Sequence, residues 1–276
     1  MKVERISAFS YKNDGGNPAG VLFSDEMLSD EKMLEIAKEV NYSETAFLVK
    51  KDDSFRIRYF SPETEIAFCG HATVASGYCI GQKFGLGNYT LDLNDGSIDI
   101  EVSQKDDKSY TSFSSVPTHS KEIENEFINS IIESFSFSKE HLDDKYPIKI
   151  AFSGNNHLLI FLKDKEEFSS MKYNFQKVKK LMEKKSIVTI SILFEENENL
   201  YHSRNAFAYG GVVEDPATGS AAVALGEYLR DTGIKTSGEI EILQGFDMKQ
   251  PCQLFVSYSD IPNSSIKVSG ASRVIE

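Results

Sequence analysis

The sequence feature that most constrains the fold is a short repeated motif. Residues 69–77 (CGHATVASG) and residues 218–226 (TGSAAVALG) are identical at five of nine aligned positions. Both copies combine glycines with closely spaced alanines, which let a helix pack tightly against its surroundings. Two copies are too few for a solenoid, so the repeat predicts a chain with two similar halves. The alternative is chance similarity between two Ala/Gly-rich helices.

The segments before each copy support a true repeat. Ser29 is a good N-cap for a helix that runs to about Val40, and a strand-like segment follows at residues 43–49. In the second half Asn174 caps a similar helix, and a strand-like segment follows at residues 187–194. The same order of elements is therefore expected in both halves.

These patterns predict an α+β fold with two pseudo-symmetric halves, each a mixed sheet wrapped around a central helix. A polar stretch places the boundary between residues 1–117 and residues 118–276. The sequence allows the last strand of the second half to cross back to the first half.

Composition narrows the function classes. The 276 residues carry a formal net charge of −12, which argues against a nucleic-acid partner because phosphate binding needs clustered Lys and Arg. No apolar run approaches the roughly 18 residues of a membrane span, and the first residues lack an apolar signal core. Three cysteines without metal-ligand spacing indicate no metal site and a reducing cytoplasm.

A glycine directly precedes each predicted central helix, Gly70 in the first half and Gly219 in the second. The first amides of a helix have no partner within it and carry partial positive charge, so they bind anions. Two such starts facing each other across a cleft would hold a carboxylate without any Arg or Lys. The alternative is that each glycine only permits a tight turn into the helix.

Polar side chains accompany these glycines. His71 and Ser220 follow them directly, where a neutral histidine would suit hydrogen bonding or proton transfer. Ser220 could equally be a simple hydroxyl at a helix start. Asp215-Pro216 is typical of an N-cap and first helical residue, although a site role for Asp215 is compatible with that.

Glu44 is the strongest single candidate for chemistry. By alternation it shares a strand face with Ala46 and Leu48, where a carboxylate loses solvation. Such a group suits general acid/base catalysis. The alternative is an exposed glutamate on an edge strand. Other mechanisms lack their motifs: the sequence contains no P-loop, GxSxG elbow, HExxH or GxGxxG.

Four motifs together resemble the PhzF (phenazine-biosynthesis-like) family. They are residues 17–21 (NPAGV), residues 43–47 (SETAF), residues 68–73 (FCGHAT) and residues 214–221 (EDPATGSA), and they span nearly the whole chain in the family's order. The resemblance implies a fold like diaminopimelate epimerase, with the site in the cleft between the halves. It also implies homodimers and neither a metal nor an organic cofactor.

The resemblance implies a proton-shift isomerase acting on a small carboxylate, with Glu44 as acid/base. The family's supporting residues correspond to His71, Asp215 and Ser220. We expect the substrate to be contacted by Asn17, Cys69, Gly70, Thr218 and Gly219.

Two departures from the family pattern bear on function. Gln244-Gly245 is present, but the later segment is Lys249-Gln250-Pro251 and lacks the family's arginine. Cys69 matches one catalytic cysteine of the epimerases, whereas its counterpart is Thr218, which disfavours a two-thiol epimerase. An epimerase or racemase using Cys69 with Glu44 remains an alternative, as does a non-catalytic binding protein on the same scaffold.

Overall fold

The computed structural model describes residues 2–275 as two compact units. The first unit extends to Ser114 and resumes at Ser269, and the second comprises Ser115–Val268. The last strand thus begins in the second unit and ends in the first. Within the described residues, no helix has both the length and the hydrophobicity needed to cross a membrane.

The first unit is a closed barrel of strands. Its strands are β1 (Glu4–Ala8), β2 (Asn17–Phe23), β3 (Glu44–Lys50), β4 (Ser54–Phe60), β5 (Glu65–Ile66), β6 (Gly87–Asp92), β7 (Ser97–Lys105), β8 (Lys108–Ser114) and β17 (Lys267–Val274). Pairing runs from β1 through β2, β3, β4, β6, β7, β8 and β17 back to β1. The β2–β3 and β4–β6 pairs are parallel, so the sheet is mixed.

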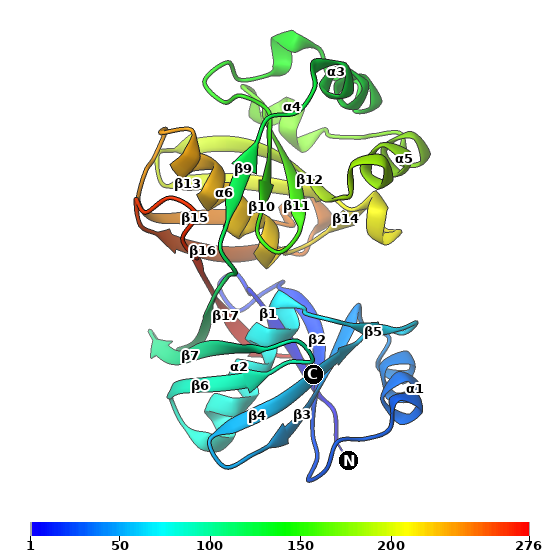
Figure 1. The fold of residues 1–276 in the computed structure, drawn as a ribbon, viewed down its shortest axis with the longest axis vertical. Coiled ribbons are helices and arrows are strands. Elements are labelled where there is room, and N and C mark those ends of the chain that lie inside the picture. The colour runs from blue at the N-terminus through cyan, green and yellow to red at the C-terminus, as the bar shows by residue number, and fades with distance from the viewer. Residues whose placement is uncertain (1, 276) are drawn as a thin grey trace. The chain divides into compact units, whose positions relative to one another are not determined.

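Helix α2 (Gly70–Phe84) is enclosed by these strands (Figure 1). Its small residues allow this close packing: a Cβ on Gly77 would lie 2.3 Å from Cγ2 of Thr111 on β8. Helix α1 (Asp30–Val40) covers the outside of the barrel, where Met33 and Val40 belong to one apolar cluster with Phe47 of β3. The helix predicted after Ser29 is therefore confirmed, and the Ser29 side chain accepts a hydrogen bond from the amide of Lys32.

The second unit repeats the order of elements, with a mixed sheet and its own central helix. Its strands are β9 (His119–Lys121), β10 (Lys149–Phe152), β11 (Asn156–Phe161), β12 (Ile187–Asn197), β13 (Leu200–Ala206), β14 (Glu214–Asp215), β15 (Gly238–Gln244) and β16 (Cys252–Tyr258). Its helices are α3 (Asn125–Ser134), α4 (Lys165–Ser169), α5 (Phe175–Lys185) and the central α6 (Gly219–Asp231), with 3-10 turns η1 (Lys139–His141), η2 (Ala208–Gly210) and η3 (Phe246–Met248). The β11–β12 and β13–β15 pairs are parallel, as are β2–β3 and β4–β6 in the first unit.

Matching ion pairs mark the pseudo-symmetry at the level of side chains. Arg58 of β4 holds Glu65 of β5 through two N–H···O bonds of 2.7 and 2.6 Å. Arg204 of β13 holds Glu214 of β14 in the same way, at 3.1 and 2.8 Å. The fold class predicted from the repeat, two similar halves with a central helix in each, is confirmed.

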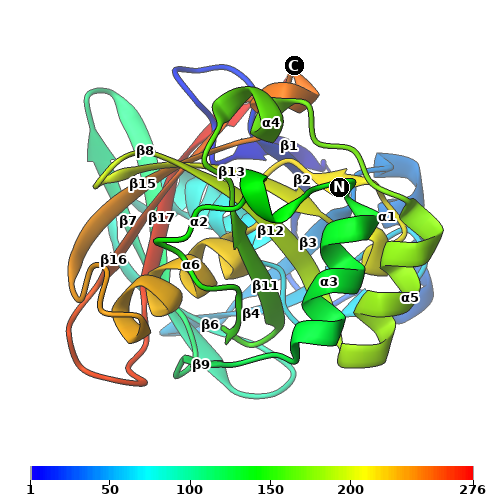
Figure 2. The ribbon, with the colours of Figure 1, turned by 90° about the horizontal axis from the view of Figure 1, so that it is seen from above.

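Helices α3 and α5 lie side by side on the outer face of the second unit (Figure 2). Phe127 and Ile131 of α3 and Val178 and Met182 of α5 share one apolar core with the sheet. Helix α5 occupies the place in the chain that α1 has in the first unit, and both end at a residue in the left-handed region.

Candidate active site

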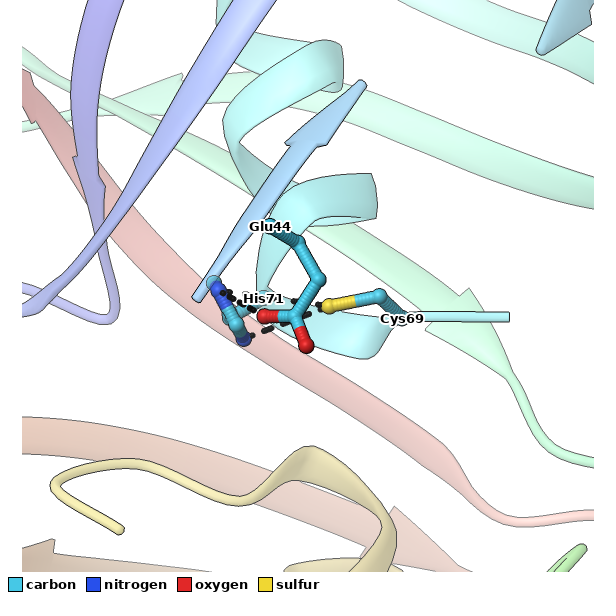
Figure 3. A group of neighbouring side chains, drawn as sticks. All are labelled: Glu44, Cys69 and His71. Atoms are coloured by element: carbon cyan, nitrogen blue, oxygen red, sulfur yellow. Dashed lines mark hydrogen bonds and ion pairs between the residues drawn. The ribbon is translucent and has the colours of Figure 1, made fainter. Parts of the chain in front are cut away.

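Three side chains, one from a strand and two from the start of a helix, converge in the first unit. Glu44 is the first residue of β3, Cys69 is the N-cap of α2, and His71 lies in the first turn of α2. Their carboxylate, thiol and imidazole groups each have a ligand atom within 4.8 Å of the other two. Figure 3 shows the three side chains gathered at the start of the helix. The sequence spacing indicates no metal-ligand cluster, because Glu44 comes from a distant strand that only the fold brings to the helix start.

His71 is the centre of this group. Its Nε2 lies 3.3 Å from Oε2 of Glu44 and 3.4 Å from Oγ of Ser43. The Sγ atom of Cys69 lies 3.3 Å from Nδ1 and 3.9 Å from Nε2 of the same ring. The imidazole therefore contacts both the carboxylate and the thiol, and its position can support proton exchange with either.

Glu44 occupies a largely buried position. Strand β3 lies between β2 and β4, so the edge-strand interpretation of Glu44 is wrong. The side chain is 19% exposed, and Oε2 is buried without a hydrogen-bond partner among the described residues. Its approach to His71 is within ion-pair distance but lacks hydrogen-bond geometry. A buried carboxylate oxygen without a partner is costly, and an arriving proton or ligand would satisfy it.

The start of α2 is held by a chain of buried hydroxyl groups. The Tyr59 hydroxyl lies 2.7 Å from Oγ1 of Thr73, which in turn donates to the carbonyl oxygen of Cys69 at 2.8 Å. Burial raises the pKa of Tyr59 well above its ordinary value, so the phenol keeps its proton. These bonds fix the backbone that carries Cys69.

Asn17 and Gly70 lie in the same unit as this group. Asn17 begins β2 and is buried, two positions before Ala19, which pairs with Glu44. Alternation along the strand places Asn17 on the same sheet face as Glu44. Gly70 is the first residue of α2, rather than the residue before the helix.

The second helix start has its own polar group. The hydroxyl of Thr218, the N-cap of α6, donates to the carboxylate of Asp215. Gln244 is buried, and its Nε2 donates to the Asp215 carbonyl oxygen at 2.7 Å and to Oγ1 of Thr218 at 3.2 Å. The expectation that Asp215 caps the helix and Pro216 begins it is wrong, because Asp215 ends β14 and the helix starts at Gly219. The carboxylate instead orders the N-cap hydroxyl.

Gly219 and Ser220 form the first turn of α6. The Ser220 carbonyl oxygen accepts a hydrogen bond of 2.7 Å from Oγ of Ser153. Neither N-cap side chain, Cys69 or Thr218, accepts a hydrogen bond from the first amides of its helix within the described part of the chain. Both starts therefore keep the amide geometry that favours anion binding.

The second unit has no carboxylate at the position equivalent to Glu44, as far as residues 2–275 show. Arg58 and Arg204 are equivalent, because each forms the matching ion pair, with Glu65 and Glu214 respectively. The residues that follow them, Tyr59 and Asn205, are therefore equivalent too. Tyr59 lies opposite Ala46, and Asn205 lies opposite Ser191. Glu44 lies two positions before Ala46 on β3, and Thr189 lies two positions before Ser191 on β12.

Thr189 has a different partner from Glu44. Its hydroxyl lies 2.7 Å from Nδ1 of His157, which is completely buried on β11. Burial lowers the pKa of His157 from 6.5 to about 3, so this imidazole is neutral at ordinary pH. The pseudo-symmetric position thus carries a neutral pair.

Two residues of these groups are not predicted from the sequence patterns. Gln244 belongs to the Gln-Gly motif, and in the fold it ties Asp215 to Thr218. Ser43 stands beside Glu44 in the sequence, and its contact with His71 depends on where α2 begins. The signal for Gln244 is present in the motif, whereas Ser43 can be found only in the fold.

Comparisons with known proteins agree with this architecture. A family model described as "Phenazine biosynthesis-like protein" matches residues 6–276. A curated relative, the uncharacterized isomerase YddE of Escherichia coli strain K12, is 32% identical over 235 residues, covering 83% of this chain and 78% of that protein.

Solved structures show the same fold. A phenazine biosynthesis protein of the PhzF family from Bacillus anthracis has a TM-score of 0.89 at 23% identity, covering 100% of this chain and 98% of that one. A probable proline racemase from Agrobacterium radiobacter K84, solved with bound carbonate, has a TM-score of 0.67 at 9% identity, covering 99% and 90%. At these identities the likeness concerns the fold alone.

Proposed function

This chain belongs to the family of phenazine biosynthesis-like proteins, and we propose that it is an isomerase that moves a proton on a small carboxylate substrate. The observation that carries this proposal is the buried, unpartnered Oε2 of Glu44, 3.3 Å from Nε2 of His71. A carboxylate oxygen held in this way is a suitable acceptor for a proton from carbon.

In the proposed reaction, Glu44 takes a proton from one carbon of the substrate and returns it to another. The electron pair of the broken C–H bond shifts along the conjugated system, so the product is an isomer and the carboxylate is regenerated. His71 lies beside the Glu44 carboxylate and can donate a hydrogen bond to the negative charge that develops on the substrate.

The substrate carboxylate is proposed to bind at the amides that begin α2 and α6. Gly70 and Gly219 are the first residues of these helices, and no N-cap side chain among the described residues occupies their amides. The expectation that both starts share one substrate, in a cleft between the halves, remains part of the proposal. Asp215 and Ser220 would then order the second start.

The epimerase alternative using Cys69 with Glu44 is less well supported. An epimerase needs two bases on opposite sides of one carbon, each within about 3 Å of it. Reactive atoms of Glu44 and Cys69 lie within 4.8 Å of each other and both contact His71, so they form one group. A pure binding protein has no need of a buried carboxylate without a partner.

Three further properties belong to the proposal because the family resemblance implies them. The enzyme is proposed to work without a metal or organic cofactor, as a homodimer, and in the cytoplasm. Analytical ultracentrifugation tests the dimer, and activity after exhaustive treatment with chelator tests the independence from metal.

Deuterium exchange tests the proposed reaction even while the substrate is unidentified. Wild-type protein is incubated in D₂O with a panel of small unsaturated carboxylic acids, and proton NMR follows each C–H position. We expect deuterium to enter at least one acid, together with a shifted double bond. No exchange across a broad panel, from protein that binds these acids, would contradict an isomerase.

A further inference from the structure

The group formed by Glu44, Cys69 and His71 has the composition of a metal site. Thiolate, imidazole and carboxylate are the three ligand types that Zn²⁺ takes from proteins, and three protein ligands leave one coordination position open. From this geometry we propose that the group binds Zn²⁺, or a similar thiophilic divalent cation, reversibly, and that binding inhibits the proposed isomerase. The metal is an inhibitor here and takes no part in the reaction.

The distances fit a tetrahedral ion. Zn–N and Zn–O bonds of about 2.0–2.2 Å place nitrogen and oxygen ligands about 3.3 Å apart, and a Zn–S bond of about 2.3 Å places sulfur and nitrogen about 3.6 Å apart. Nε2 of His71 lies 3.3 Å from Oε2 of Glu44 and 3.9 Å from Sγ of Cys69. The Sγ atom is nearer Nδ1, at 3.3 Å, so a side-chain rotation of Cys69 or His71 has to bring Sγ to the Nε2 side to complete the site.

Burial favours the ion and leaves it a way in. Cys69 and His71 are each 8% exposed, so coordination would take place largely away from bulk water. The Glu44 side chain is 19% exposed and provides the open side. The Oε2 atom of Glu44, buried and without a hydrogen-bond partner among residues 2–275, is directed toward His71 (Figure 3). The ion would supply that partner.

Metal coordination releases a proton but leaves the oxidation states of the metal and of the sulfur unchanged. The Cys69 thiol releases its proton to the buffer as the Zn–S bond forms, and the His71 nitrogen binds through its lone pair. The Glu44 oxygen lone pair then belongs to the metal and cannot accept a proton from substrate. Metal binding stands independently of the proposed function, whereas inhibition rests on it.

Cobalt titration tests the metal site directly. Metal-free protein is titrated with Co²⁺, and a thiolate-to-cobalt charge-transfer band is followed in the near ultraviolet; Zn²⁺ should then displace the cobalt and remove the band. We expect the band in the wild type and in Cys79→Ala, which loses another buried thiol of α2. We expect its loss in Cys69→Ala and in Cys69→Ser, with circular dichroism confirming that at least one of them folds.

Affinity provides a second readout. Loss of a partner of a metal ligand typically lowers affinity by about 10–100-fold, and loss of a ligand should cost at least that much. Glu44→Gln should therefore keep the band and weaken binding by about tenfold or more. Absence of the band in wild type, or its persistence in a folded Cys69 variant, would overturn the site.

Activity separates the two proposals. If exchange in D₂O occurs, saturating Zn²⁺ should abolish it and EDTA should restore it. Full exchange with Zn²⁺ bound would overturn the inhibition and leave the isomerase intact. Cobalt binding without exchange under any condition would overturn the isomerase and leave the metal site.

Discussion

Glu44 and Thr189 hold the same position in their two sheets, yet only Glu44 carries a carboxylate. Glu44 lies two positions before Ala46, which pairs with Tyr59, the residue after Arg58. Thr189 lies two positions before Ser191, which pairs with Asn205, the residue after Arg204. Thr189 contacts a neutral histidine, whereas Glu44 contacts His71 within a group that includes a thiol. Of these two equivalent positions, only the one in the first unit therefore offers a carboxylate as a candidate base.

The Cys69 thiol is predicted to be dispensable for the isomerase reaction. Its counterpart Thr218 has a hydroxyl bonded to Asp215 and cannot act as a second thiol base. Cys69→Ala should keep turnover within a hundredfold of wild type, equivalent to about 2.7 kcal/mol of barrier. Cys79→Ala is the matched control, and steady-state kinetics is the measurement. A larger loss confined to the Cys69 variant would favour the epimerase.

The helix starts are predicted to hold the substrate carboxylate. A side chain at Gly219 would crowd the first amides of α6, so Gly219→Val should weaken the binding of small monocarboxylic acids. Gly70→Val should have the same effect at α2. Isothermal titration calorimetry measures the affinity, and circular dichroism confirms folding. Unchanged affinity in both variants would place the carboxylate elsewhere.

Helix α2 is predicted to tolerate no added bulk at Gly77. Alanine is normally favoured over glycine in a helix by about 1 kcal/mol. At Gly77 the new Cβ would lie 2.3 Å from Cγ2 and 2.5 Å from Oγ1 of Thr111, and overpacking typically costs about 1–3 kcal/mol. Gly77→Ala should lower the free energy of unfolding.

Gly226 provides the comparison in the second unit. Its added Cβ would lie 3.0 Å from Cγ1 of Val256, 3.2 Å from Cδ1 of Tyr258 and 3.4 Å from Cδ1 of Ile266, which is less crowded than at Gly77. Urea unfolding followed by circular dichroism should show a clearly smaller loss for Gly226→Ala than for Gly77→Ala. Equal losses would contradict the tighter packing around Gly77.

Stability is predicted to fall between pH 7 and pH 5 because of His157. Its pKa is about 3 in the folded chain and 6.5 when unperturbed, so below pH 6.5 the unfolded chain takes up a proton that the folded chain does not. The stabilisation that the neutral His157 contributes is fully present above pH 6.5 and is lost as the pH falls toward 3. At pH 5 the loss amounts to about 2 kcal/mol.

A non-titrating variant isolates this effect. His157→Gln removes the titrating group, so its unfolding free energy should change less between pH 7 and pH 5 than that of wild type. His119→Gln, at an exposed histidine, serves as the control and should behave like wild type. An identical pH dependence in His157→Gln and wild type would contradict the assignment.

Much of the fold could be predicted from local patterns. Ser29 and Asn174 cap the helices expected after them, and the repeated Gly/Ala motif marks both central helices. The sequence allows the last strand to cross back to the first half, but its pairing with β1, which closes the first barrel, could not be predicted from local patterns. Such long-range pairing leaves no periodicity in the sequence.

The candidate site is predictable in its residues but less so in its contacts. Glu44 and His71 are both expected from the sequence, and their 3.3 Å approach follows from how β3 meets the start of α2. The Asp215-Pro216 pair resembles a helix start, but the chain continues through a short strand and Thr218 before α6 begins. Gln244 then supplies the bonds that hold this non-helical turn.

Comparison of Glu44→Gln with wild type tests the central claim most directly. The amide is nearly isosteric with the carboxylate but cannot exchange the proton, so exchange or turnover should fall by about 10²–10⁴-fold. Binding of small acids and thermal stability should change little, and stability could rise because an unpartnered buried carboxylate is removed. A variant that binds and turns over like wild type would contradict the proposed mechanism, since the isomerase would have lost its base without consequence.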